Sequence, residues 1–144
     1  MSSIQHKVIV KAWVEKEGKY LLAQRGQTEK HHAGIWSLPG GNVDGEVADS
    51  ILEVTLQREI REEIGIEVFN KMELIYNNGF IKDSDGSHVI NLTFLCKYKS
   101  GEARALEDTA GIDWYSLEDL KNLKDVPDFL QREISYLVQY LENA

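Results

Sequence analysis

Three glutamates close together on one predicted helix are the residues of this sequence best suited to chemistry. Glu59, Glu62 and Glu63 are spaced i, i+3 and i+4, so they share one helix face with neighbouring Cβ atoms about 5–6 Å apart. Carboxylates at this separation repel one another and raise one another's pKa values. A divalent cation relieves the repulsion, and oxygen-only ligands suit Mg²⁺ or Mn²⁺, of which Mg²⁺ also binds substrate phosphates. The pattern therefore predicts a metal-assisted phosphate site.

The same pattern is also typical of a solvated helix face, because Arg58 and Arg61 offset the acidic charge. Two observations favour the metal site. The glutamates border the apolar stripe of the helix instead of lying opposite it. A glycine pair, Gly40 and Gly41, follows Pro39 upstream of the helix and permits a tight or left-handed backbone.

The helix that carries the glutamates is predicted over residues 48–64, which contain neither glycine nor proline. Its apolar residues recur at four-residue steps, as expected for an amphipathic helix: Leu52, Leu56, Ile60 and Ile64. Asp49 or Ser50 is the predicted N-cap, and Gly65 is predicted to end the helix.

The rest of the chain predicts strands mixed with helices, which indicates an α/β or α+β layered domain. The predicted strands are residues 8–14, 20–24, 66–76, 79–82, 89–97 and 114–115. The predicted turns are 16–19 and 83–86, and residues 25–35 are predicted to be a long loop. A short helix is expected from Ser116, and a C-terminal helix over residues 127–141 with proline in its first turn.

Composition narrows the function classes. The 144 residues carry 24 acidic and 16 basic side chains, a formal net charge of −8. This surplus argues against binding to a nucleic-acid polymer or a membrane, because both are polyanionic. Cys96, the one cysteine, lies in an apolar run and is predicted to be a buried thiol. With no signal-like segment or membrane span in the sequence, we expect a cytoplasmic protein.

Residues 58–66 read Arg-Glu-Ile-Arg-Glu-Glu-Ile-Gly-Ile, which resembles the closing half of the sequence box of the Nudix hydrolase family. Gly41 resembles the glycine that opens the box. Residues 20–25, 34–41 and 114–120 are also similar to family segments, so the resemblance covers most of the chain. It implies a MutT-like enzyme in which residues 1–144 form a single domain. The implied fold is a Nudix-type α/β/α sandwich with a mixed β-sheet.

The middle of the box departs from the family pattern. Gly41 and Arg58 are 17 positions apart, where the family spacing gives 14. Counting back from Arg58, Ser50 occupies the place of the family's first glutamate. Glu46 resembles that glutamate displaced by an insertion, and either Glu46 or Glu53 is a candidate partner for Arg58. The metal-binding half of the box is intact.

The resemblance implies a Mg²⁺-dependent pyrophosphohydrolase (with Mn²⁺ as a possible substitute) that cleaves a nucleoside diphosphate derivative. By resemblance, Glu62 and Glu63 are the principal metal ligands, and Glu59 is a further ligand or orients the attacking water. The carbonyl of Gly41 is a candidate ligand, and Arg58 is expected to support the catalytic residues. Glu107 is the candidate for a later-loop ligand or base, with Asp108 and Glu102 as alternatives.

The substrate implied by the resemblance is a small nucleotide, with a (d)NTP or modified nucleotide, hydrolysed to the monophosphate, as the first choice. Arg25 is a candidate phosphate contact, and Gly40 and Gly41 are expected beside the substrate. The candidate stacking residues are Trp13, Trp36 and Phe80, with core packing as the default for Trp13. His31 and His32 are weaker candidates for contact with phosphate. The alternatives are hydrolysis of ADP-ribose or another nucleotide sugar, and a non-catalytic nucleotide sensor. A C-terminal apolar stripe is predicted to be core, with a homodimer contact as the alternative reading: Ile134, Leu137, Val138 and Leu141.

Overall fold

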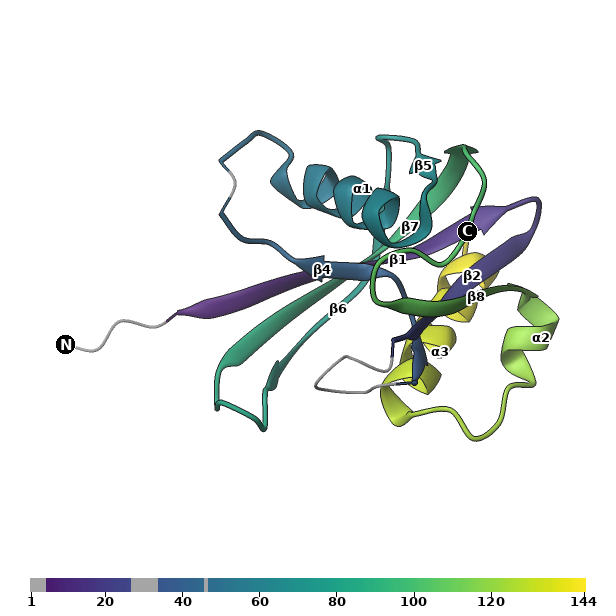
Figure 1. Cartoon of the computed structure of the whole chain (residues 1–144). Helices are drawn as coiled ribbons and strands as arrows, with labels where there is room; N and C mark the ends of the chain where they lie inside the picture. The colour runs from purple at the N-terminus through teal and green to yellow at the C-terminus, as the bar shows by residue number, and fades with distance from the viewer. Residues whose placement is uncertain (1–4, 27–33, 46) are drawn as a thin grey trace.

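A mixed β-sheet is covered by helices on both faces (Figure 1). The computed structural model describes residues 5–26, 34–45 and 47–144. Two long strands, β1 (His6–Lys16) and β7 (His88–Ser100), run parallel beside each other over ten paired residues. The other strands pair antiparallel: β2 (Lys19–Arg25), β3 (Trp36–Ser37), β4 (Gly40–Asn42), β5 (Glu67–Val68), β6 (Glu73–Ile81) and β8 (Thr109–Ser116).

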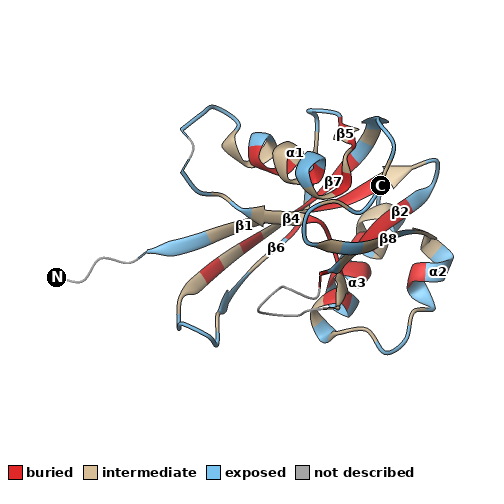
Figure 2. Ribbon diagram, viewed as in Figure 1, coloured by how far each residue is buried: buried red, intermediate tan, exposed pale blue. Residues whose placement is uncertain are grey.

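Each face of the sheet has its own apolar core. Helix α1 (Ile51–Ile64) covers one face, while α2 (Leu117–Lys121) and α3 (Asp128–Glu142) cover the other. Successive side chains of a strand point to opposite faces, so Val10 and Ala12 of β1 pack with α1, and Trp13 packs with α3. Figure 2 shows buried residues on the sheet and on the facing sides of α1 and α3. The predicted α/β/α arrangement is confirmed.

The N-terminus of α1 differs from the prediction. The helix begins at Ile51, three residues later than expected, because Ser50 has a left-handed backbone with φ 52°. Ser50 occupies the N-cap position, but its side chain makes no capping hydrogen bond. The predicted C-terminus is correct. Gly65 adopts φ 80°, and its N–H donates to the carbonyl of Arg61, as expected for a glycine that ends a helix.

The single strand predicted over residues 66–76 is wrong. The segment contains β5, which pairs with the end of β7, and the first part of β6, which pairs with an earlier part of β7. Phe69 N–H still donates to the carbonyl of Lys97 between them, and the register then shifts again between Leu74 and Tyr76. β6 continues through residues 79–81, so two predicted strands form one. Apolar content alone does not reveal where pairing with a neighbour changes register.

Most other local predictions are correct. β1 and β2 form the expected hairpin, and Ser116 Oγ accepts the N–H of Asp119 at the start of α2. Helix α3 follows Pro127, and Ile134 and Leu137 are buried in the core. Cys96 is also fully buried, and burial raises the pKa of its thiol to about 12. β8 is longer than expected, and β3 and β4 were not predicted. Within the described residues no helix is both long and apolar enough to cross a membrane.

The packing of α1 against the sheet should be a main source of stability. Leu56 is fully buried, whereas Val54 on the same helix is 39% exposed. Leu56→Ala should lower the free energy of unfolding by about 2–5 kcal/mol, since it removes buried methyl groups and leaves a cavity. Val54→Ala is the matched control and should change it by less than about 1 kcal/mol. Urea denaturation measures both, and equal losses would contradict this packing.

Candidate functional site

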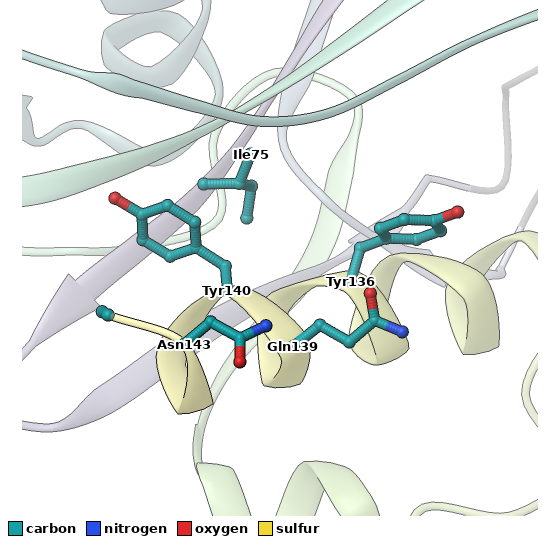
Figure 3. Close-up of a pocket in the computed structure, with 6 residues that line it drawn as sticks. Ile75, Tyr136, Gln139, Tyr140 and Asn143 are labelled. Carbon is teal, nitrogen blue, oxygen red and sulfur yellow. The ribbon is translucent and has the colours of Figure 1, made fainter.

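We considered two hollows in the surface of the described part of the chain as candidate sites. One, of about 280 Å³, is a shallow groove beside the C-terminal half of α3. Figure 3 shows Tyr136 and Tyr140 projecting from that helix near Ile75 of β6. No carboxylate or basic side chain lines this groove, so it lacks groups for phosphate or metal chemistry. Its lining residues are Ile75, Tyr136, Gln139, Tyr140, Asn143 and Ala144.

The second hollow is a cleft of about 380 Å³ that contains most of the predicted site residues. Helix α1, the segment that follows strand β4 and the loop before β8 supply its acidic groups. Two arginines, one on β2 and one on α1, supply positive charge. The charged and glycine residues that line it are Arg25, Gly40, Gly41, Asp44, Arg58, Glu59, Glu63, Glu107 and Asp108. The cleft therefore combines carboxylates with cationic groups that suit a phosphate.

Gly40 brings the glycine strand unusually close to β1. It pairs with Lys11, and a Cβ atom added at Gly40 would lie 2.0 Å from the carbonyl oxygen of Val10. A side chain at this position would collide with backbone. The tight or left-handed backbone that the two glycines permit is not adopted, because residues 40 and 41 belong to the extended strand β4, without positive φ. The glycine is needed for close approach instead.

Glu63 is fixed against this strand. Its Oε1 accepts the N–H of Gly40 at 3.0 Å. Burial raises the pKa of the Glu63 carboxyl to about 8, the Gly40 hydrogen bond opposes the rise, and the charge of Glu59 adds to it. A carboxyl that is both buried and close to other acids binds a proton or a cation more readily than a surface carboxyl does.

Glu59 lies one turn earlier on α1, against Gly41. A Cβ atom added at Gly41 would come within 2.5 Å of the Glu59 carboxyl carbon. Burial raises the pKa of Glu59, and its ion pair with Arg58, at 3.5 Å, opposes the rise. The negative charges of Glu62, Glu107 and Asp44 raise it further. The absence of a side chain at Gly41 thus leaves room for the carboxylate of Glu59, which lies in an acidic environment.

The loop that carries Glu107 is tied to the end of α1. The N–H groups of Arg104 and Leu106 donate to the carbonyls of Ile64 and Glu63, each at 2.9 Å. These bonds satisfy carbonyls that the end of a helix leaves without partners. Glu107 follows with a left-handed φ of 50°, which costs backbone energy for a non-glycine residue, and its side chain lines the cleft. The structure therefore brings Glu107 to the glutamates of α1.

Glu62 differs from its two partners. It is exposed and does not line the cleft, although its charge contributes to the raised pKa of Glu59. Among the described residues, no three histidine, cysteine, aspartate or glutamate side chains are already grouped tightly enough to hold a metal ion. The donor types nevertheless fit a hard divalent cation, since every acidic group facing the cleft offers carboxylate oxygens. A bound cation would require the exposed glutamates to turn toward Glu59 and Glu63.

The remaining candidates fall into three groups. Arg25 and Arg58, the candidates for a phosphate contact and a supporting residue, both line the cleft. Trp36 is half-buried against the apolar core on the α3 side and does not line the cleft, and Phe80 is 41% exposed on β6. The structure therefore does not bring these two aromatic residues to the carboxylates. Three further candidates lie outside the described residues: His31, His32 and Glu46.

One acidic residue of the cleft was missed by sequence reasoning. Asp44 lines the cleft, and its charge acts on Glu59. The available signal was its position three residues after Gly41, in the segment that joins the glycine strand to the glutamate helix. It was overlooked because the spacing of a loop residue does not indicate where its side chain lies.

The sequence of the chain is similar to those of known proteins. The sequence profile described as the NUDIX domain matches residues 5–136. The chain is 30% identical over 131 residues to a protein of Klebsiella pneumoniae named nucleoside triphosphatase NudI, covering 83% of this chain and 88% of that one. It is 32% identical over 117 residues to an ADP-ribose pyrophosphatase of Methanocaldococcus jannaschii, covering 81% and 65%. A further curated relative is matched over only 41% of its own length.

A solved structure supports the same relationship. The crystal structure of a MutT NUDIX hydrolase from Burkholderia pseudomallei superimposes with a TM-score of 0.74 and 28% sequence identity. The superposition covers 92% of this chain and 98% of that one. The fold is therefore shared over nearly the full length of both chains.

The half-buried carboxyl of Glu63 should make stability depend on pH. Because its folded-state pKa is raised from 4.5 to about 8, the folded chain binds more protons than the unfolded chain between these values, and stability falls as pH rises through them. Glu63→Gln keeps an acceptor for Gly40 and removes the buried charge. With a chelator present, it should match wild type below pH 4.5 and exceed it above pH 8 by on the order of a few kcal/mol.

Chemical denaturation at a series of pH values measures this difference. Glu118→Gln, at an exposed position on α2, controls for the loss of one acidic residue. A difference between Glu63→Gln and wild type that stays constant from pH 4 to pH 9 would contradict the burial of this charge.

Proposed function

Because the chain belongs to the Nudix hydrolase family, whose members hydrolyse phosphorus-containing anhydrides, we propose that it is a Mg²⁺-dependent pyrophosphohydrolase. The proposed substrate is a nucleoside triphosphate or a modified nucleotide. Its cleavage gives the nucleoside monophosphate and inorganic diphosphate. The observation that carries the proposal is the gathering of Glu59, Glu63 and Glu107 in one cleft with Arg25 and Arg58. The relative named nucleoside triphosphatase supports the substrate class.

Family members generally use divalent metal ions. In this chain we assign Glu59, Glu62 and Glu63 as the ligands of Mg²⁺, which Mn²⁺ can replace, with Glu107 and the carbonyl of Gly41 as further candidates. The bound cation supplies charge neutralisation for the diphosphate and activation of water. The raised pKa values of Glu59 and Glu63 support this assignment, since burial and mutual repulsion favour a counter-charge.

The other cleft residues position the substrate. Arg25 extends from the end of β2 and is proposed to contact phosphate oxygens, which a guanidinium binds with paired hydrogen bonds. Arg58 is proposed to orient Glu59, with which it forms an ion pair. Glu59 or Glu107 is the proposed acceptor for a proton of the attacking water, because both carboxylates face the cleft and neither is tied to a backbone donor by a described hydrogen bond.

A second candidate substrate is ADP-ribose, favoured by the relative from Methanocaldococcus jannaschii. It places the same diphosphate chemistry in the same cleft and differs in the group beyond the second phosphate. A non-catalytic sensor is disfavoured because the three glutamates of the metal-binding half of the box, Glu59, Glu62 and Glu63, are present. We further propose that residues 1–144 form one domain that acts in the cytoplasm. The possible homodimer stays a prediction.

Hydrolysis assays test the proposal directly. Purified protein is incubated with the four common nucleoside triphosphates, their deoxy forms and ADP-ribose, with Mg²⁺, with Mn²⁺ or with a chelator, and products are separated by ion-exchange chromatography. We expect metal-dependent release of a monophosphate and diphosphate from at least one triphosphate. Binding without turnover of any compound would favour the sensor, and turnover of ADP-ribose alone would favour the second candidate.

The exposed glutamate of the cluster provides a sharper prediction. Glu62→Gln should lower kcat at least about a hundredfold with Mg²⁺, since removal of a ligand charge weakens the stabilisation of the transition state. It should leave the thermal unfolding midpoint within about 2 °C of wild type, because Glu62 is exposed. Glu118→Gln on α2 is the control and should retain full activity. Wild-type kcat in Glu62→Gln would refute its role as a ligand.

A further inference from the structure

Two histidines meet across neighbouring strands at the end of the sheet where β1 begins. His6 of β1 is the direct partner of His88 of β7 in their parallel ladder. The two Nδ1 atoms are 2.7 Å apart, and the rings meet edge to face with their centroids 4.7 Å apart. Neither residue lines the cleft. We call His6 and His88 the histidine pair.

The contact between the rings aims two nitrogen atoms at one point. At 2.7 Å, one imidazole donates its Nδ1–H, and the other accepts it with the lone pair of an unprotonated Nδ1. Histidine is also the commonest metal ligand, and it binds a metal ion through an unprotonated ring nitrogen. The position of the shared proton is therefore the position from which a metal ion contacts both rings.

The geometry suits a tetrahedral metal ion after a small adjustment. Metal–nitrogen bonds of about 2.0–2.1 Å at a tetrahedral angle place two ligating nitrogens roughly 3.3 Å apart. The two Nδ1 atoms must therefore separate by roughly 0.6 Å, which a small rotation of the exposed His6 side chain supplies. The ring that carries its proton on Nδ1 takes the Nε2–H tautomer instead, so both rings stay neutral and no proton is lost.

The strands and the adjoining turn hold the histidine pair in position. Gly79 of β6 leaves room for the His88 ring, since a Cβ atom added there would lie 3.2 Å from Nε2. In the turn between β6 and β7, Asp85 Oδ1 accepts the backbone N–H and the hydroxyl of Ser87. Asp85 Oδ2 accepts from Lys7 Nζ at 2.7 Å, which ties the turn to β1. Ligands that are already in place lose little conformational entropy when they bind an ion.

Solvent reaches the histidine pair. His6 is exposed and His88 is half-buried, and this end of the sheet extends beyond the helices (Figure 1). The described residues place no third histidine, cysteine or carboxylate in a metal-binding group with the pair, so water completes the coordination of an ion bound here. The net charge of −8 attracts cations to the surface of the protein.

We propose that the histidine pair binds a divalent transition metal ion, with Zn²⁺ as the ion on which the proposal is tested. Imidazole nitrogen suits Zn²⁺, whereas Mg²⁺ takes oxygen ligands. The site is therefore separate from the carboxylates of the cleft both in place and in ligand chemistry. The bound ion links the first residue of β1 to the first residue of β7 and stabilises their pairing. This role is independent of the proposed function.

The first experiment measures Zn²⁺ binding by isothermal titration calorimetry, with excess Mg²⁺ present to occupy the carboxylates of the cleft. His6→Asn and His88→Asn should each weaken Zn²⁺ binding at least about tenfold, because each removes one of two protein ligands. His32→Asn is the matched control, since it removes a histidine from another part of the chain, and it should bind Zn²⁺ as wild type does. Unchanged affinity in both pair variants, or an equal loss in the control, would overturn the inference.

The second experiment uses wild type alone, so it does not depend on the folding of a variant. Long-range ¹H–¹⁵N spectra of the imidazole rings report which nitrogen carries the proton. Without metal, one ring of the pair should carry its proton on Nδ1, and with Zn²⁺ both rings should carry it on Nε2. If the spectra of all four histidines stay unchanged at tenfold excess of Zn²⁺, the pair is not a metal site.

Thermal unfolding provides a third measurement. An ion that binds only the folded chain raises its stability, so Zn²⁺ at about a hundredfold excess over its dissociation constant should raise the unfolding midpoint of wild type by at least about 5 °C. The midpoint of His88→Asn should rise by less than about 2 °C under the same conditions. An equal rise in both proteins would show that Zn²⁺ acts elsewhere and would contradict the assignment.

Discussion

The arrangement of the cleft depends on how closely β4 approaches β1 at Gly40. A side chain there would meet the Val10 carbonyl, so only glycine lets the two strands pair at this position. Their pairing places the Gly40 N–H where it donates to Glu63 on α1. The sheet, the glycine strand and the glutamate helix are thereby held in one fixed relation. Gly41 extends the same geometry, because its missing side chain leaves space for Glu59.

The second constraint acts at the other end of α1. Gly65 ends the helix, and the following loop returns to donate two N–H groups to its last carbonyls. The bonds that complete the helix also carry Glu107 to the cleft, so a stabilising interaction and a functional placement have the same origin. The left-handed backbone of Glu107 is maintained because the loop on both sides of it is bonded, to α1 through Leu106 and to the Leu106 carbonyl through Thr109.

Charged side chains lie at different depths on the two faces of the sheet. On the α1 face the core is apolar, and the carboxylates gather at its border, where burial raises the pKa values of Glu59 and Glu63. On the α3 face the carboxylate of Glu133 and the amide of Asn91 lie inside the core, each with an oxygen that has no hydrogen-bond partner among the described residues. Local rules of core packing are violated at both places, and such violations are expected where a protein binds or transforms a ligand.

The sequence alone was sufficient for the family, the α/β/α class, the helix that carries the glutamates and its glycine terminus. These features depend on interactions between residues close in the chain, such as the four-residue apolar steps of α1 and the left-handed preference of Gly65. It was also sufficient to nominate Glu59, Glu63 and Glu107. It did not indicate that residues 66–76 form parts of two strands, because register with β7 depends on residues far along the chain.

Only the tertiary structure decided which candidates meet. It placed Glu107, Asp44 and Arg25 in one cleft with Glu59 and Glu63, and left Trp36 and the exposed Glu62 outside it. It also showed that Gly40 serves close strand approach instead of a turn, and that Glu133 faces Thr93 and Asn91 across forty or more residues of chain. The reason is common to all of these. Burial, orphaned acceptors and raised pKa values arise from contacts between distant segments, and local sequence patterns do not contain those contacts.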